Sequence, residues 1–309
     1  MSVRRRFAVR GLVACCLVCM LRPLAAAPAA GAAPAAGEYS IKLSHASKVG
    51  ERTLLTGSFQ SDEQSVVTVA GKEDRQEKHA TYRFAFVQKV LAIGAKGNRV
   101  RVELAVQKLI REANGATTEL LKAGDVISVR LEGGQQVWEM GGAPLAAELK
   151  EALDSAVETP GDDEPTEDDI FGTARRHRVG DSWPIDAKLL AAQLSQKGMP
   201  ATIKGVTGTA TLAGTKSVQG VPCLEVRLDV ELHDVKLPIP DLPAGVVMAP
   251  LTVHFTGAWV VPVDGVRDAL ELSQDFRLPL AANGTIEGAP FTMRSELRRV
   301  TNIQLSPPS

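Results

Sequence analysis

The side chains that could act as acids, bases or nucleophiles form no recognisable catalytic motif in this sequence. A G-x-S-x-G segment, which presents the serine nucleophile of many hydrolases, is absent. Histidine, the commonest general acid or base, occurs five times at scattered positions, His45, His79, His177, His233 and His254. We therefore assign no catalytic residue. A hydrolase would have to use two carboxylates that meet only in the folded chain.

Metal-binding patterns are also missing. The sequence has neither an H-E-x-x-H nor an H-x-x-x-H pair, so it predicts no zinc site. Residues 162–169 (DDEPTEDD) are strongly acidic, but they lack the alternating spacing of a calcium loop and Pro165 interrupts them. We interpret this run as a solvated linker and expect no metal and no cofactor.

The segment 237–250 (LPIPDLPAGVVMAP) is the best candidate for a binding surface. It is apolar, with one charged residue and four prolines, so it suits a stiff extended loop better than a central strand. Apolar side chains on such a loop must cover a core edge, a cavity or a partner. The loop is therefore either a flap that seals one end of a sheet or a functional lid. Its candidate binding residues are Leu237, Ile239, Leu242, Val246, Val247 and Met248.

The N-terminus has the features of a cleaved signal peptide, residues 1–27. Four arginines precede an apolar stretch over residues 11–20, and small residues follow at 25–27. The apolar stretch is shorter than the ~20 residues that a membrane helix needs, so we expect no membrane span in the mature chain. Arg4-Arg5-Arg6-Phe7 also fits a twin-arginine signal, which leaves the export route open. Residues 28–37 form an Ala/Pro-rich tether, which we expect to be disordered.

Removal of this segment changes the charge and the cysteine content. Residues 1–37 hold five of the 35 Lys and Arg and none of the 36 acids, so the remainder has 30 basic and 36 acidic residues, a formal charge of −6. A net acidic chain argues against a nucleic-acid partner. Three of the four cysteines also leave with the signal, so Cys223 is alone and no internal disulfide can form.

Alternation of apolar and polar residues dominates the rest of the chain and predicts antiparallel strands with one buried face. It is clearest at Leu224, Val226, Leu228, Val230 and Leu232, which alternate with polar residues. Turn residues such as Gln219-Gly220 and Asn283-Gly284 separate neighbouring strands by only a few residues. The predicted fold class is mainly β, with long antiparallel hairpins forming curved sheets in two halves and two short helices in the middle connector.

Apolar residues at a spacing of four predict the two helices, over 144–157 and 185–196. We expect an N-terminal β half at 38–158, which includes the first helix, and an acidic linker at 159–172. A C-terminal β half at 173–306 would include the second helix. In Gly180-Asp181-Ser182-Trp183-Pro184, Asp181 or Ser182 can cap that helix while Trp183 anchors it in a core, so this motif needs no catalytic role.

The motif Val179-Gly180-Asp181-Ser182-Trp183, together with Val218-Gln219-Gly220-Val221-Pro222-Cys223, resembles a group of secreted bacterial proteins that contain a domain of unknown function. The resemblance implies export and a β-rich fold, but no activity. Curved sheets with helices on one side are also similar in outline to envelope lipid-carrier lipoproteins. This chain differs from them, since it has no helix before its first strand and no credible lipobox.

The sequence thus favours an exported, non-enzymatic protein of the cell envelope, either periplasmic or secreted. We expect it to bind an apolar small molecule or an envelope partner protein. The alternative is an exported hydrolase that uses surface carboxylates. A carrier would need a continuous apolar cavity between a sheet and the 237–250 loop.

Overall fold

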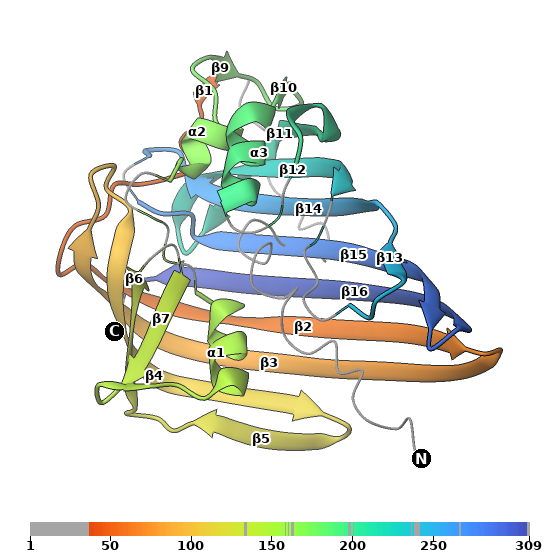
Figure 1. The fold of residues 1–309 in the computed structure, drawn as a ribbon. Helices are drawn as coiled ribbons and strands as arrows, with labels where there is room; N and C mark the ends of the chain where they lie inside the picture. Colours follow the sequence, from red (N-terminus) through yellow and green to blue (C-terminus); the bar gives the residue numbers. More distant parts are fainter. Residues whose placement is uncertain are drawn as a thin grey trace.

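The computed structural model describes residues 37–307 apart from 133–134, 158, 160, 162–163, 197–198, 200, 236, 238–241 and 266. The predicted signal peptide, and the tether as far as residue 36, lie outside the described residues. The described chain forms one large antiparallel sheet with a few short helices (Figure 1). The predicted fold class, mainly β with long antiparallel hairpins, is confirmed.

The sheet contains 14 strands, and a second sheet of two strands pairs β1 with β9. The order in the large sheet is β10-β11-β12-β14-β15-β16-β2-β3-β4-β6-β7-β8, with β13 beside β15 and β5 beside β4. The strands are β1 (Tyr39–Ser40), β2 (Arg52–Val69), β3 (Lys72–Ile93), β4 (Arg99–Ala113), β5 (Ala116–Leu121), β6 (Val126–Glu132), β7 (Gln135–Met140), β8 (Ala143–Pro144), β9 (Arg176–His177), β10 (Ser182–Pro184), β11 (Val206–Val218), β12 (Val221–Val235), β13 (Val246–Met248), β14 (Leu251–Pro262), β15 (Glu271–Ile286) and β16 (Ala289–Ser306).

The two halves expected from the sequence are joined by backbone pairing between β2 and β16. These strands pair antiparallel from Leu54 opposite Ser306 to Val69 opposite Phe291. The first long strand and the last therefore lie side by side in the middle of the sheet, and the two halves form one continuous surface (Figure 1).

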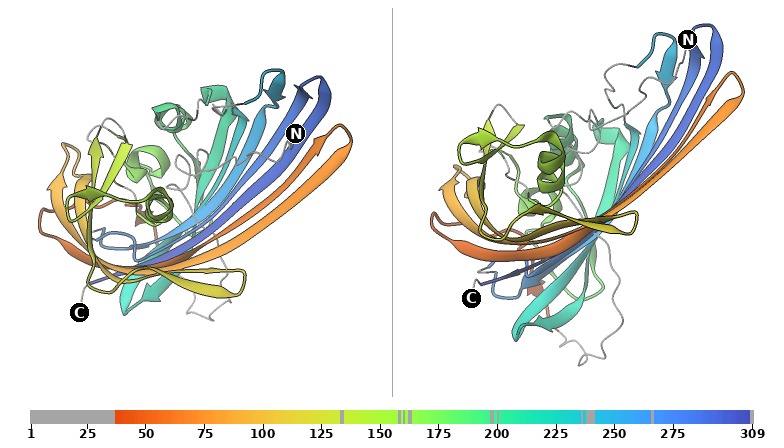
Figure 2. Two further views of the ribbon diagram at one scale, coloured as in Figure 1. Left: turned by 60° about the horizontal axis from the view of Figure 1, so that its bottom comes forward. Right: turned by 90° about the horizontal axis from the view of Figure 1, so that it is seen from below.

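The helices lie in the concavity of the bent sheet (Figure 2). They are α1 (Ala147–Asp154), α2 (Glu167–Phe171), α3 (Ala187–Gln196) and a 3-10 turn, η1 (Ile203–Gly205). The helix α2 begins within the acidic segment that we interpreted as a linker. Thr166 caps it, since its hydroxyl accepts from the Asp169 amide while the Asp169 carboxylate accepts from the Thr166 amide. Ile170 and Phe171 are then buried at its end.

Two apolar clusters fill the concave side, because alternate side chains of every strand point to it. One joins β11, β12, β14 and β15 to α2 and α3, through residues such as Trp183, Leu194 and Leu228. The other joins β2, β3, β4, β6 and β7 to α1, through residues such as Phe86 and Leu153. The two clusters meet near Leu272, a partly buried residue that packs against both of them.

The convex face carries ion pairs between neighbouring strands. Asp275 accepts hydrogen bonds from Arg298 at 2.5 Å and also lies 3.6 Å from Arg277. Burial raises the pKa of this carboxyl, but the hydrogen bonds and charges of Arg298 and Arg277 outweigh burial and lower it overall. His254 lies 2.8 Å from Asp229 on the same face. These contacts connect strands across the face that the helices leave uncovered.

Candidate functional site

A cavity of about 230 Å³ lies between the concave face of the sheet and the segments that cross it. Its sheet side is formed by inward-facing residues of β2, β14, β15 and β16, namely Leu55, Trp259, Leu272, Ile303 and Leu305. Its other side is formed by residues 43–47, 154–157 and 165–171 and by Gln193 of α3. The cavity therefore lies where the two halves of the chain and the connector come together.

Three buried glutamines line this cavity, whose wall combines apolar side chains with polar and charged ones. Gln88 of β3, Gln193 of α3 and Gln274 of β15 are 5%, 6% and 6% exposed. The side-chain nitrogen of Gln193 donates to Glu164 Oε2 at 3.2 Å, whereas its oxygen Oε1 has no hydrogen-bond partner among the described residues. A buried acceptor without a donor costs free energy, so this oxygen is an unsatisfied polar atom in a side chain that lines the cavity.

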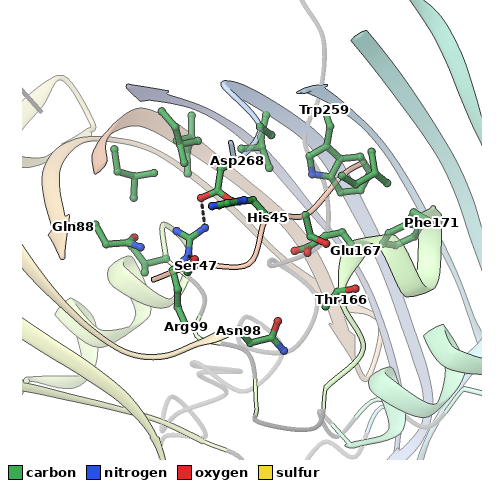
Figure 3. Close-up of a pocket in the computed structure, with 18 of the residues that line it drawn as sticks. His45, Ser47, Gln88, Asn98, Arg99, Thr166, Glu167, Phe171, Trp259 and Asp268 are labelled. Atoms are coloured by element: carbon green, nitrogen blue, oxygen red, sulfur yellow. Dashed lines mark hydrogen bonds and ion pairs between the residues drawn. The ribbon is translucent and has the colours of Figure 1, made fainter. Parts of the chain in front are cut away.

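An ion pair lies at the side of the cavity where the N-terminal segment meets the β3–β4 turn. Arg99 pairs with Asp268, and its Nε donates to Ser47 Oγ at 2.9 Å. Figure 3 shows Arg99 and Asp268 directed toward each other. The neighbouring Asn98 donates to the carbonyl oxygens of Gly161 and Glu164 at 3.2 and 3.3 Å. These bonds fix the covering segments over the sheet.

The end of α1 is held against the sheet by a second polar network. Asp154 Oδ1 accepts from Trp138 Nε1 at 2.6 Å and from Gln136 Nε2 at 2.8 Å, and Oδ2 accepts from Lys150 Nζ at 2.6 Å. The next residue, Ser155, accepts from the buried guanidinium of Arg299 at 2.9 Å. Asp154 and Ser155 both line the cavity, so this network sets the position of one of its walls.

The carboxylates that line the cavity do not form a catalytic pair. Asp154 is held by Trp138 and Lys150, Asp268 is paired with Arg99, and Glu167 is exposed. A glycosidase mechanism needs two facing carboxyl groups, one of them kept protonated by its surroundings. The observed pairing gives the hydrolase alternative no support at this site.

The predicted binding residues of the 237–250 loop lie elsewhere, over the far end of the long hairpins. β13 pairs with β15, and Leu242, Val246 and Met248 pack with a small cluster that includes Phe291 and Met293. Leu237 packs against the larger cluster, Val247 is 66% exposed, and Ile239 lies outside the described residues. None of the described loop residues lines the cavity. The described loop residues thus pack against the sheet away from the cavity, and the role of the loop as a binding surface stays a prediction.

The cavity residues were missed because they lack a motif, although a weaker signal exists. Gln88 and Gln274 occupy inward positions in strands that otherwise bury apolar residues, between Phe86 and Val90 and between Leu272 and Phe276. A polar residue on the buried face of an amphipathic strand indicates either a buried hydrogen-bond network or a ligand. The sequence could have shown these positions but not that they converge.

The remaining candidate residues have structural surroundings. His177 stacks on Trp183 with ring centroids 4.4 Å apart, and His233 lies 3.2 Å from Glu231. Cys223 is buried, and this burial raises the pKa of its thiol. Among the described residues no cluster of His, Cys, Asp and Glu could hold a metal ion.

A second hollow, of about 550 Å³, lies on the convex face over β2, β14, β15 and β16. It is larger, but its walls include charged side chains of which Lys216 and Glu271 pair with each other at 2.5 Å. It contains no buried polar atom that lacks a partner among the described residues. We therefore take the concave cavity as the candidate site.

Comparisons with known proteins leave the family open. No family model and no curated protein matches the sequence. Solved structures that match include a DUF1329 family protein from Desulfovibrio piger, 11% identical over 81% of this chain and 84% of that one. They also include MucB in complex with MucA(peri), 10% identical over 82% of this chain and 94% of that one. Both have a TM-score of 0.12, which is too low to transfer a site or an activity. Within the described residues, no helix is long and apolar enough to cross a bilayer.

Proposed function

We propose that this chain is an exported, non-enzymatic binding protein that holds a small amphipathic molecule in the concave cavity. The observation that carries the proposal is the composition of the cavity wall. The sheet contributes leucine, isoleucine and tryptophan side chains, whereas three buried amides supply hydrogen-bonding groups, one with an acceptor oxygen that has no partner among the described residues. Ligand sites are typically apolar with a few polar groups that fix orientation.

The size of the cavity limits the ligand. At about 230 Å³ it is somewhat smaller than the typical range for drug-sized ligands, so it would accept a small molecule or one end of a longer amphiphile. Each 100 Å² of apolar ligand surface removed from water contributes about 2.5 kcal/mol before the cost of association. The apolar wall therefore provides affinity, and the amides of Gln88, Gln193 and Gln274 provide orientation.

Export and location in the envelope stay part of the proposal, since they depend on the signal-like segment 1–27, which lies outside the described residues. The 237–250 loop also stays a proposed contact surface, separate from the cavity. Val246, which is buried, and Met248, which is partly buried, hold it against the sheet and leave Val247 exposed for a partner protein.

Filling the cavity is expected to weaken the binding of an amphipathic probe. Ala156 lines the cavity just after α1 and is 5% exposed, so Ala156→Phe places a phenyl ring in the ligand space. We expect the dissociation constant of anilinonaphthalene sulfonate, measured by fluorescence titration, to rise by roughly tenfold or more, about 1.4 kcal/mol.

Ala147→Phe is the matched control, because Ala147 lies at the exposed first position of the same helix. It should bind the probe like the unaltered protein. If both variants bind equally well, or if neither they nor the unaltered protein binds the probe, the concave cavity is not the binding site. Thermal unfolding of each variant shows whether it is folded.

A further inference from the structure

Among the residues that the structure describes, the first part of β3 has a strand partner on one side only. Residues 72–80 pair with β2, from Lys72 opposite Val69 to Ala80 opposite Ser61, but β4 begins to pair with β3 only at Thr81. Residues 72–79 are exposed on both faces of the sheet. The hairpin of β2 and β3 extends beyond the helical layer (Figure 2, orange). Its outer edge thus offers backbone N–H and C=O groups to another strand.

The side chains on this edge are self-complementary in charge. If two copies of the strand pair antiparallel with Gln76 opposite Gln76, Arg75 of each copy faces Glu77 of the other. In the same register Asp74 faces Lys78, and Glu73 faces His79. Each of the other charged residues between 73 and 79 then faces a residue of opposite charge directly across the junction, and Glu73 faces His79. Opposite charges at facing positions stabilise an antiparallel pair, and like charges destabilise it.

We propose that two copies of this chain associate through the free edge of β3, in antiparallel register centred on Gln76, to form a sheet that continues across both molecules. A two-fold axis through Gln76 makes the two sides of the contact identical, as a symmetric dimer requires. This proposal is independent of the ligand cavity, which lies on the concave side toward the other end of the long strands.

The neighbouring strand supports the same arrangement. Within one copy, Lys78 pairs with Glu63 of β2 at 2.8 Å, and His79 pairs with Asp62. Across the junction these rows continue to Asp74 and Glu73 of the second copy. Each row then runs from an acidic residue of β2 to a basic residue of β3 in the same copy, and on to an acidic residue of β3 in the other copy.

The length of the edge also fits. The free edge ends just after Ala80, where the turn at Asn114 and Gly115 joins β4 to β5. At its other limit, the turn at Ala70 and Gly71 comes directly before the first residue of β3. A second strand over residues 72–80 fills the available edge. It covers polar rather than apolar surface, so we expect a reversible dimer whose stability depends on ionic strength.

Charge exchange at Arg75 and Glu77 tests the proposal. These two residues face Val66 and Gln64 of β2, which are uncharged, so substitutions here do not place a like charge against β2. In the dimer, Arg75→Glu would create two places at which a glutamate faces a glutamate. Glu77→Arg would create two places at which an arginine faces an arginine. The double variant Arg75→Glu/Glu77→Arg restores opposite charges at both places.

Sedimentation velocity over a range of protein concentrations, at low and at physiological ionic strength, gives the readout. We expect the unaltered protein to dimerise reversibly, each single variant to raise the dissociation constant by roughly tenfold or more, and the double variant to recover dimerisation. Arg75 also pairs with Glu73 of its own strand. This pair is lost in Arg75→Glu and in the double variant alike, so its loss cannot explain a difference in dimerisation between these two variants.

Two outcomes overturn the proposal. An unaltered protein that stays monomeric at all concentrations would mean that the charges only protect the edge from pairing. A dimer that persists in both single variants would place the interface elsewhere. All substituted side chains are exposed, so equal melting temperatures would show that the variants are folded.

Discussion

Substitution of Gly57 by alanine is expected to destabilise the protein by about 3 kcal/mol or more, and substitution by valine to prevent folding. A Cβ atom at Gly57 would lie 2.2 Å from the carbonyl oxygen of Asn302 and 2.9 Å from the ring of Phe84. The first of these is backbone of β16, so the clash cannot be relieved by a side-chain rotation. It falls in the strand pair that joins the two halves of the sheet.

Gly214→Ala is the matched control for this prediction. Gly214 also lies in a long strand, β11, but a Cβ atom there meets nothing within 4 Å. Urea unfolding followed by circular dichroism should show a large loss of stability for Gly57→Ala and little change for Gly214→Ala. Equal stabilities for the two variants would contradict the close approach of β2 and β16.

Removal of the Asp154 carboxylate is expected to cost about 3 kcal/mol, because Asp154→Ala leaves buried donors without an acceptor. The residue is 6% exposed and accepts from the indole of Trp138, itself 2% exposed, as well as from Gln136 and Lys150. Loss of these bonds should also release the end of α1 and so loosen the cavity wall at Ser155 and Ala156.

Asp154→Asn separates the two roles of this carboxylate. The amide keeps an oxygen that can accept from Trp138 and Gln136, but it replaces the oxygen that accepts from the partly exposed Lys150 by an NH2 group. We therefore expect Asp154→Asn to lose less stability than Asp154→Ala, since fewer buried donors are left without an acceptor. The free energies of unfolding from urea titrations check this order. A loss as large for asparagine as for alanine would mean that the charge, rather than the hydrogen bonds, holds α1.

Much of the fold could be predicted from local sequence patterns. The alternation from Leu224 to Leu232 matches β12, in which every one of these apolar residues is buried. The turn expected at Gln219-Gly220 forms with positive φ angles of 51° and 80°, between β11 and β12. Such features depend on neighbours in the chain, and so they leave a readable pattern.

The pairing of β16 with β2 could not be predicted in this way. It joins residues that are far apart in the chain, such as Leu54 and Ser306. The alternation of an amphipathic strand shows which face is buried, but not which strand it pairs with. The same is true of the cavity. Its glutamines come from β3, α3 and β15, and only the curvature of the sheet brings them together. The helix α2 could have been predicted, because the capping box of Thr166 and Asp169 is visible in the sequence. We interpreted the segment as a linker because of its many acidic residues.

Native mass spectrometry of the protein purified from its exported fraction tests most directly whether the concave cavity holds a small amphipathic molecule. We expect a reproducible mass above that of the polypeptide, which organic extraction identifies as an amphipathic compound. The excess mass should be absent from Ala156→Phe but retained by Ala147→Phe. A bare polypeptide mass in every sample, under conditions that preserve non-covalent complexes, would contradict the proposed function.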